Sequence, residues 1–153
     1  MKIEIADFLP KHAKAIAQIE QQCFSSPWSE TAVLDSYNTN TLFFVALDGN
    51  KVVGYCGMQQ VLDEGFVTNI AVLPQYRNLG IGKMLVGRLV EYARANRLAS
   101  VSLEVRTSNS VAQHLYSSFG FSAVGMRNGF YSKPSENAII MTFFTDSEKE
   151  LNN

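Results

Sequence analysis

The sequence predicts an α/β domain with a mixed, twisted sheet, and three patterns support this fold class. The largely apolar stretch at residues 41–61 is interrupted by Asp48-Gly49-Asn50, which is typical of a β-hairpin. Residues 66–106 have the pattern of strand, helix and strand, and such a βαβ crossover joins parallel strands. Two further strands, at about 121–127 and 138–144, follow a second short helix. This order predicts antiparallel and parallel pairs in one sheet, with helices on both faces.

The N-terminal segment should hold one strand and two helices. Residues 2–8, KIEIADF, alternate apolar and charged side chains, as a half-buried strand does. Pro10 can open the first helix. The apolar stripe of this helix consists of Ala13, Ile16, Ala17 and the pair Ile19 and Glu20. Ser26 or Ser29 can cap a second, shorter helix that ends near Tyr37.

The hairpin leads into the crossover. The turn DEG at residues 63–65 should bring the chain into a strand at 66–72. Asn96 is expected to end the helix that follows, because apolar residues recur before it at helical spacing. These are Ile81, Met84, Leu85, Leu89 and Ala93. Residues 99–105, ASVSLEV, form the second strand of the crossover.

The last third begins with the segment TSNSVAQHLYSSFG, which predicts a short helix. Ser108 or Asn109 should cap it, and Gly120 should end it. Its buried stripe should be Val111, Leu115 and Phe119, leaving Tyr116 toward one flank. The loop NGFYSKPSEN separates the two final strands, and the polar segment TDSEKELNN is expected to fray.

Size and composition limit the possible classes of protein. The 153 residues fit a single domain, which we place at 1–146, followed by a polar tail at 147–153. The formal net charge of −1 argues against a broad surface for nucleic acid. No apolar run reaches the length of a membrane span, and the N-terminus lacks a signal-like segment. We therefore expect a cytoplasmic protein that acts on neither membrane nor nucleic acid.

The cysteines and histidines offer no metal site. Cys23 and Cys56 lie 33 positions apart without a CxxC pairing, so we expect buried, reduced thiols. His12 and His114 are not in a ligand spacing such as HExxH, and we expect both at the surface.

The stretch VTNIAVLPQYRNLGIGKMLV places Gly80 and Gly82 just before a helix. Backbone N–H groups can approach an anion at such a point, which favours a pyrophosphate. The P-loop pattern GxxxxGK[ST] is absent, because methionine follows Lys83. A Rossmann fingerprint is a better rival, since Glu104 ends a strand 24 positions after the first glycine, but the connection is long and only one crossover occurs. Close helix packing is a further explanation of the glycines.

Two motifs resemble those of the GNAT superfamily of N-acetyltransferases. YRNLGIG matches the pattern [Q/R]-x-x-G-x-[G/A], with Arg77, Gly80 and Gly82 in place. NSVAQHLYSSFGF resembles the later element N-x-x-A-x-x-L-Y-x-x-x-G-F, and the two follow in the same order about 30 residues apart. Within the superfamily the chain is most similar to the RimI-type ribosomal-protein-alanine N-acetyltransferases. The shared stretches are PWSE (27–30), NIAV (69–72), LEVR (103–106) and AIIM (138–141).

The resemblance implies a GNAT fold and acetyl-CoA as cosubstrate, without a metal. It places the CoA pyrophosphate on the backbone of Asn78, Leu79, Gly80, Ile81, Gly82 and Lys83. It places the pantetheine arm along the backbone of Ile70, Ala71 and Val72, with a hydrogen bond from Asn109. A free strand edge suits that role, because it offers unpaired N–H and C=O groups, one of which can polarise the thioester carbonyl.

The resemblance also implies two catalytic residues. Glu104, at the carboxyl end of a crossover strand, should act as the base, directly or through water. Its alternative is a solvated charge or a partner for Arg106. Tyr116 holds the position of the proton donor to the leaving thiolate, and its alternative is a packed aromatic. Cys23 and Cys56 lie outside both motifs, which favours direct transfer without an acyl-enzyme.

The acceptor implied by the resemblance is a protein N-terminus, namely the N-terminal alanine of a small-subunit ribosomal protein. Trp28 and Tyr131 lie on loops expected at the acceptor end, where they serve either peptide recognition or loop anchoring. The family commonly has tyrosine in place of Phe130 and an acidic residue in place of Asn137, which puts the acceptor in doubt and not the donor. The alternatives are a lysine side chain, a polyamine or another small amine as acceptor, and a non-catalytic acetyl-CoA-binding module.

Overall fold

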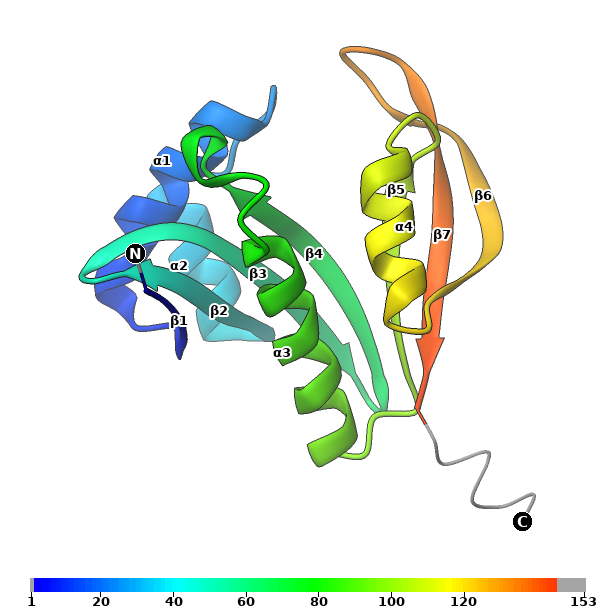
Figure 1. The fold of residues 1–153 in the computed structure, drawn as a ribbon, viewed down its shortest axis with the longest axis horizontal. Coiled ribbons are helices and arrows are strands. Elements are labelled where there is room, and N and C mark those ends of the chain that lie inside the picture. Colours follow the sequence, from blue (N-terminus) through cyan, green and yellow to red (C-terminus); the bar gives the residue numbers. More distant parts are fainter. Residues whose placement is uncertain (1, 146–153) are drawn as a thin grey trace. The chain divides into compact units, whose positions relative to one another are not determined.

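The structure, a computed structural model, describes residues 2–145 (Figure 1). In this part of the chain the strands form a seven-stranded sheet in the order β1-β2-β3-β4-β5-β7-β6. The strands are β1 (Ile3–Asp7), β2 (Thr41–Asp48), β3 (Lys51–Val61), β4 (Glu64–Val72), β5 (Ser100–Arg106), β6 (Ser122–Tyr131) and β7 (Glu136–Phe144). The helices are α1 (Ala13–Cys23), α2 (Glu30–Thr39), α3 (Ile81–Ala95) and α4 (Ser110–Ser118), with 3-10 turns η1 (Pro10–His12) and η2 (Pro74–Tyr76). β4 pairs with β5 in parallel, whereas β1–β2, β2–β3, β5–β7 and β6–β7 are antiparallel. The mixed sheet with one crossover is confirmed.

The described chain forms two compact units. The first comprises the residues up to Gln60 together with Thr68–Arg88. The second comprises Val61–Val67 and the residues from Leu89 onward. The crossover β4–α3–β5 contributes to both, and each unit has its own buried side chains.

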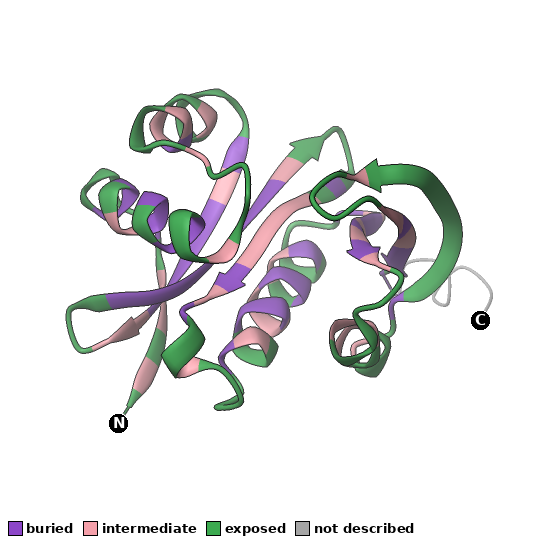
Figure 2. Cartoon of the chain, turned by 90° about the horizontal axis from the view of Figure 1, so that it is seen from above, coloured by how far each residue is buried: buried purple, intermediate pink, exposed green. Residues whose placement is uncertain are grey.

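The first unit buries both faces of its strands, as the apolar runs in β2 and β3 predict. Phe43 and Phe44 are each 1% exposed and point to opposite faces, as successive strand residues must. The Phe43 ring meets Trp28, beside α1 and α2, at 6.4 Å. The Arg88 guanidinium, from α3, lies 4.3 Å from the Phe44 ring centroid. Helices therefore cover both faces of this unit (Figures 1 and 2).

Several boundaries follow from turn chemistry. Ser29 Oγ accepts from Ala32 N at 3.1 Å, so Ser29 and not Ser26 caps α2. Gly49 adopts φ +62° and lets Asp48 pair directly with Lys51 across the hairpin. β4 begins at Glu64, two residues before the predicted start, because Leu62 with φ +55° closes a shorter turn.

Glu20 is the least expected member of the first core. It lies on the buried face of α1 and is only 1% exposed. Its carboxylate accepts from the Tyr55 hydroxyl at 2.6 Å, from Trp28 N at 3.0 Å and from Asn69 Nδ2 at 3.4 Å. Burial raises its pKa, and the bonds from Tyr55 and Trp28 oppose that shift. Glu20 therefore ties α1 to β3, β4 and the segment before α2.

We expect Glu20→Ala to lower the free energy of unfolding by about 2–4 kcal/mol, because it leaves the Tyr55 hydroxyl and the Trp28 N–H buried without an acceptor. Urea unfolding measures the change. Glu4→Ala, an exposed glutamate on β1, is the control and should stay within about 0.5 kcal/mol of the wild type. Equal effects of the two substitutions would show that the buried carboxylate contributes no net stability.

The second unit is built on β5, β7 and β6. β7 lies between the other two, with Glu104 opposite Ile140 and Arg127 opposite Ala138. β6 is exposed along most of its length (Figure 2). The predicted ten-residue loop between the last strands is wrong, because β6 continues to Tyr131 and β7 already begins at Glu136.

Two sequence expectations about burial are wrong. Val111, predicted to be buried in α4, is 79% exposed, because it lies in the first turn of a helix without buried residues. His12, predicted at the surface, is 8% exposed and its Nδ1 accepts from Leu9 N at 2.9 Å. His114 is exposed as expected. Both cysteines are free, with Cys56 buried and Cys23 half-buried.

Candidate active site

The glycine loop lies in the first unit, between η2 and α3. Arg77 braces it, since Nε donates to Val72 O at 3.2 Å and Nη2 to Cys23 Sγ at 3.4 Å. Asn78 and Gly80 adopt φ +64° and +82°. When left-handed residues alternate with ordinary ones along a loop, their backbone N–H groups point toward one concave side. Such a concave side binds anions.

The start of α3 extends this anion geometry. Met84 N donates to Gly80 O at 3.1 Å as the helix begins. The amides of Ile81, Gly82 and Lys83 precede that bond, at the positive end of the helix dipole. A Cβ added to Gly80 would meet no atom within 4 Å, so the loop faces open space there. The residues present therefore fit a pyrophosphate.

β4 supplies the neighbouring backbone. Ala71 is 5% exposed, while Ile70 and Val72 are half-buried. A Cβ on Gly54 of β3 would lie 3.0 Å from Ala71 O, so glycine there permits close approach of the two strands. On the other side of β4, pairing with β5 joins Glu64–Phe66 to Ser100–Ser102, ahead of Ile70.

Glu104 lies on β5 in the second unit. Its Oε1 is 3.6 Å from Arg127 Nε on β6, and the side chain is 27% exposed. The alternative that it pairs with Arg106 is wrong, because Arg106 Nη1 lies 3.3 Å from Glu136 Oε1 instead. Glu104 is thus a partly solvated carboxylate with an exposed cation, Arg127, beside it.

Two tyrosines, Tyr131 and Tyr116, belong to the same unit as Glu104. Burial raises the pKa of Tyr131, and the Glu104 charge adds to that shift. Burial raises the pKa of Tyr116 to about 12, and the Tyr131 charge contributes. Tyr116 therefore keeps its proton at neutral pH, as a proton donor must. Its ring packs on Phe121 at 6.0 Å, so the hydroxyl is presented from a supported ring.

Asn109 is the N-cap of α4. Its Oδ1 accepts from Ala112 N at 3.1 Å, which settles the cap in favour of Asn109 over Ser108. The same side chain is exposed, so its amide group faces solvent beside the cap.

Trp28 anchors its segment to the first unit. Its backbone bonds to Glu20, and its half-buried ring lies edge-on to Phe43. These contacts favour the loop-anchoring interpretation of Trp28 over peptide recognition.

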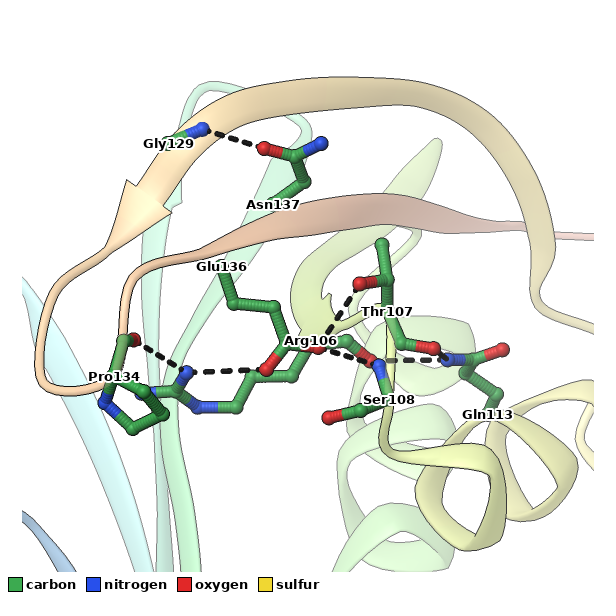
Figure 3. Close-up of polar contacts among 8 residues, drawn as sticks. All are labelled: Arg106, Thr107, Ser108, Gln113, Gly129, Pro134, Glu136 and Asn137. Carbon is green, nitrogen blue, oxygen red and sulfur yellow. Dashed lines mark hydrogen bonds and ion pairs between the residues drawn. The ribbon is translucent and has the colours of Figure 1, made fainter.

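A polar network surrounds Glu136, and the sequence did not predict it (Figure 3). Glu136 Oε2 accepts from Thr107 Oγ1 at 2.9 Å and from Ser108 N at 2.6 Å, and Oε1 meets Arg106. Hydrogen bonds from Ser108, and then those from Thr107 and Arg106, lower the pKa of Glu136 to about 2. Glu136, the first residue of β7, carries no sequence signal of such a role, because its partners at the end of β5 and just after it lie 28 to 30 positions away.

The lowered pKa predicts a pH-dependent contribution to stability. The folded state favours the Glu136 carboxylate, so its contribution is present above the ordinary value of 4.5 and is lost as the pH falls toward 2. Melting temperatures of the wild type and Glu136→Gln should therefore differ at neutral pH and converge between about pH 4.5 and 2. Glu64→Gln, an exposed glutamate, should show no such convergence. A wild-type advantage that persists unchanged at pH 2 would contradict this account.

Asn137 explains one departure from the family pattern. Its Oδ1 accepts from Gly129 N at 2.8 Å (Figure 3). Its Nδ2 donates to Met126 Sδ at 3.8 Å. Gly129 has φ +65° and lies where the register of β6 shifts between Arg127 and Tyr131. An acidic side chain can supply the same acceptor, so asparagine keeps this bulge.

The sheet is mixed with one parallel crossover, and the glycine loop is suited to a pyrophosphate, which is part of nucleotide-bearing cosubstrates. Residues 13–121 match the sequence profile of the acetyltransferase (GNAT) family. The chain belongs to this family: it is an N-acetyltransferase and uses acetyl-CoA as its acetyl donor. In residues 2–145 no helix is long and apolar enough to cross a membrane.

The chain is similar to several characterised acetyltransferases. It is 36% identical over 146 residues to the ribosomal protein bS18-alanine N-acetyltransferase of Haemophilus influenzae, covering 94% of this chain and 96% of the relative. It is 36% identical over 129 residues to the Escherichia coli enzyme of the same name, covering 83% and 87%. The crystal structure of the ribosomal-protein-S18-alanine N-acetyltransferase from Escherichia coli matches with a TM-score of 0.86 at 32% identity, over 94% of each chain. Ard1 from Thermoplasma volcanium matches with a TM-score of 0.83 at 27% identity, over 95% of this chain and 99% of that one.

Proposed function

We propose that the enzyme acetylates the N-terminal α-amine of a protein, and that its acceptor is the N-terminal alanine of a small-subunit ribosomal protein. The observation that carries this proposal is the presence in one unit of a partly solvated carboxylate, Glu104, and of a tyrosine that stays protonated, Tyr116. The identity of the acceptor rests on the relatives named for ribosomal protein bS18. Acetylation of a ribosomal protein takes place in the cytoplasm.

The donor should be held by backbone groups. Asn78, Leu79, Gly80, Ile81, Gly82 and Lys83 present their amides to the pyrophosphate of acetyl-CoA. Ile70, Ala71 and Val72 pair with the pantetheine arm as an added strand would, and Asn109 donates a hydrogen bond to it. When bound, acetyl-CoA supplies an activated acetyl thioester.

Glu104 prepares the acceptor. An α-amine has a pKa of roughly 7.7–8.0, so near neutral pH it becomes a nucleophile once it loses one weakly held proton. Glu104 takes that proton, directly or through water. A lysine side chain has a pKa near 10.4, so its deprotonation would need a stronger base than Glu104 alone.

Tyr116 serves the other end of the reaction. Its hydroxyl gives a proton to the sulfur that leaves, which prevents a thiolate from building up. A non-catalytic binding module has no need of either Glu104 or Tyr116.

The test is CoA release from acetyl-CoA with three acceptors. A ribosomal peptide that starts with alanine should turn over, whereas the same peptide with a blocked N-terminus and small polyamines should not. Turnover of polyamines or of the blocked, lysine-bearing peptide would replace this acceptor with a side-chain or small amine. Stabilisation by acetyl-CoA without turnover of any of the three acceptors would mean that the acceptor is a different amine.

A further inference from the structure

We propose that Arg106 and Glu136 form a clamp that positions Tyr131 for the acceptor peptide, so that Arg106 is a positioning residue for acceptor affinity. This inference rests on the proposed function. It is carried by contacts that lie wholly within the second unit, on the strand that also bears Glu104.

Arg106 makes three contacts with the β6–β7 hairpin. Its guanidinium lies 4.3 Å from the centroid of the Tyr131 ring. Its Nη1 donates to Pro134 O at 3.0 Å and lies 3.3 Å from Glu136 Oε1 (Figure 3). Tyr131 and Glu136 are also paired across the end of the hairpin. The guanidinium therefore holds the ring of the last β6 residue and the turn that follows it.

Glu136 contacts the same guanidinium nitrogen, Nη1, that donates to Pro134 O. Its second oxygen accepts hydrogen bonds from Thr107 and Ser108, so the position of the carboxylate does not depend on Arg106 alone. Gln113 Nε2 donates to Arg106 O and Thr107 O, both at 3.0 Å, and secures the same backbone from α4 (Figure 3). The clamp thus joins the hairpin to the loop that ends in Asn109.

The contacts require arginine rather than a generic cation. A planar guanidinium can stack on a ring while its edge donates to a carboxylate and a carbonyl. A lysine ammonium offers a point charge and cannot satisfy the three directions together. Arg106→Lys should therefore behave more like a loss than like a conservative change.

Tyr131 is the part of the clamp that faces the chemistry. Its ring stacks on Arg106, which lies two residues after Glu104 on β5, so the side chains of Arg106 and Glu104 project from the same face of that strand. A phenol fixed by Arg106 on the face of β5 that carries the proposed base is placed to contact the acceptor backbone. The clamp should therefore affect the KM of the acceptor more than the KM of acetyl-CoA.

The experiment is a double-mutant cycle on the KM of the alanine-starting peptide. Arg106→Gln should raise this KM about tenfold while the KM of acetyl-CoA and kcat change less than about threefold. If Arg106 acts through Tyr131, adding Arg106→Gln to Tyr131→Ala should raise the KM no further. Arg97→Gln, the same change on the exposed turn after α3, is the matched control and should match the wild type.

Folding and positioning are checked separately. Glu136 keeps its bonds from Thr107 and Ser108 in Arg106→Gln, so that variant should fold, and melting temperatures verify it. Glu136→Gln is the second variant and should raise the peptide KM in the same direction. In protein with 13C-labelled tyrosine, the Tyr131 signal, assigned with Tyr131→Phe, should shift in Arg106→Gln and not in Arg97→Gln.

Two results would overturn the clamp: a peptide KM in Arg106→Gln equal to that of Arg97→Gln, or full additivity with Tyr131→Ala. An unshifted Tyr131 signal would also overturn it. A wild type without peptide turnover would instead overturn the proposed function, and the acceptor role of the clamp with it, even where the Tyr131 signal shifts.

Discussion

Glu104→Gln should lower kcat with the alanine-starting peptide by about 10²- to 10⁴-fold at neutral pH. The substitution keeps the shape of the side chain and removes the ability to take a proton from the amine. The KM of acetyl-CoA should stay within about threefold, because the groups proposed to hold the donor are backbone groups of the other unit and the cap of α4. Steady-state kinetics with each substrate varied in turn measures both quantities.

The pH dependence of this defect separates a base from a structural charge. Above roughly pH 8 the acceptor amine loses its proton to solvent without help, so the gap between the wild type and Glu104→Gln should narrow. Glu64→Gln, an exposed glutamate on β4, is the matched control and should keep wild-type rates throughout. A defect of the same size at every pH would assign Glu104 to positioning, through its pair with Arg127, and not to proton transfer.

The elements of the fold were predictable where local chemistry decides them. The Gly49 turn, the Ser29 and Asn109 caps and the helical spacing after Gly82 act within a few residues, and the structure confirms each. The predicted bounds are wrong where a long-range contact determines the structure. The alternation of apolar and polar residues does not predict that the β6–β7 pairing extends to Tyr131. The register shifts around Gly129, and the pairing resumes after that shift.

The candidate site shows the same division. The glycine loop was predictable because the conformation of a few consecutive residues creates it. The partner of Glu104 was not, since Arg106 is nearer in sequence and Arg127 comes from another strand. Helical spacing predicts Glu20 in the apolar stripe of α1, and the structure confirms that it lies on the buried face. Its acceptor role depends on Tyr55 and Trp28, which no spacing along α1 reveals.

Tyr116→Phe should lower kcat by about 10²-fold and leave both KM values nearly unchanged. Phenylalanine keeps the ring contact with Phe121, so the variant loses the hydroxyl and little packing. Because burial raises the pKa of Tyr116 to about 12, the wild type should show no loss of rate from Tyr116 ionisation below about pH 11.

A solvent isotope effect distinguishes proton donation by Tyr116 from simple packing. If the hydroxyl gives its proton as the sulfur leaves, the wild type should turn over more slowly in D₂O and Tyr116→Phe should lose that part of the effect. Tyr37→Phe, on α2, is the matched control and should retain both the rate and the isotope effect. An unchanged rate in Tyr116→Phe would mean that water protonates the leaving sulfur, and Glu104 would then be the sole side chain that carries a proton in the reaction.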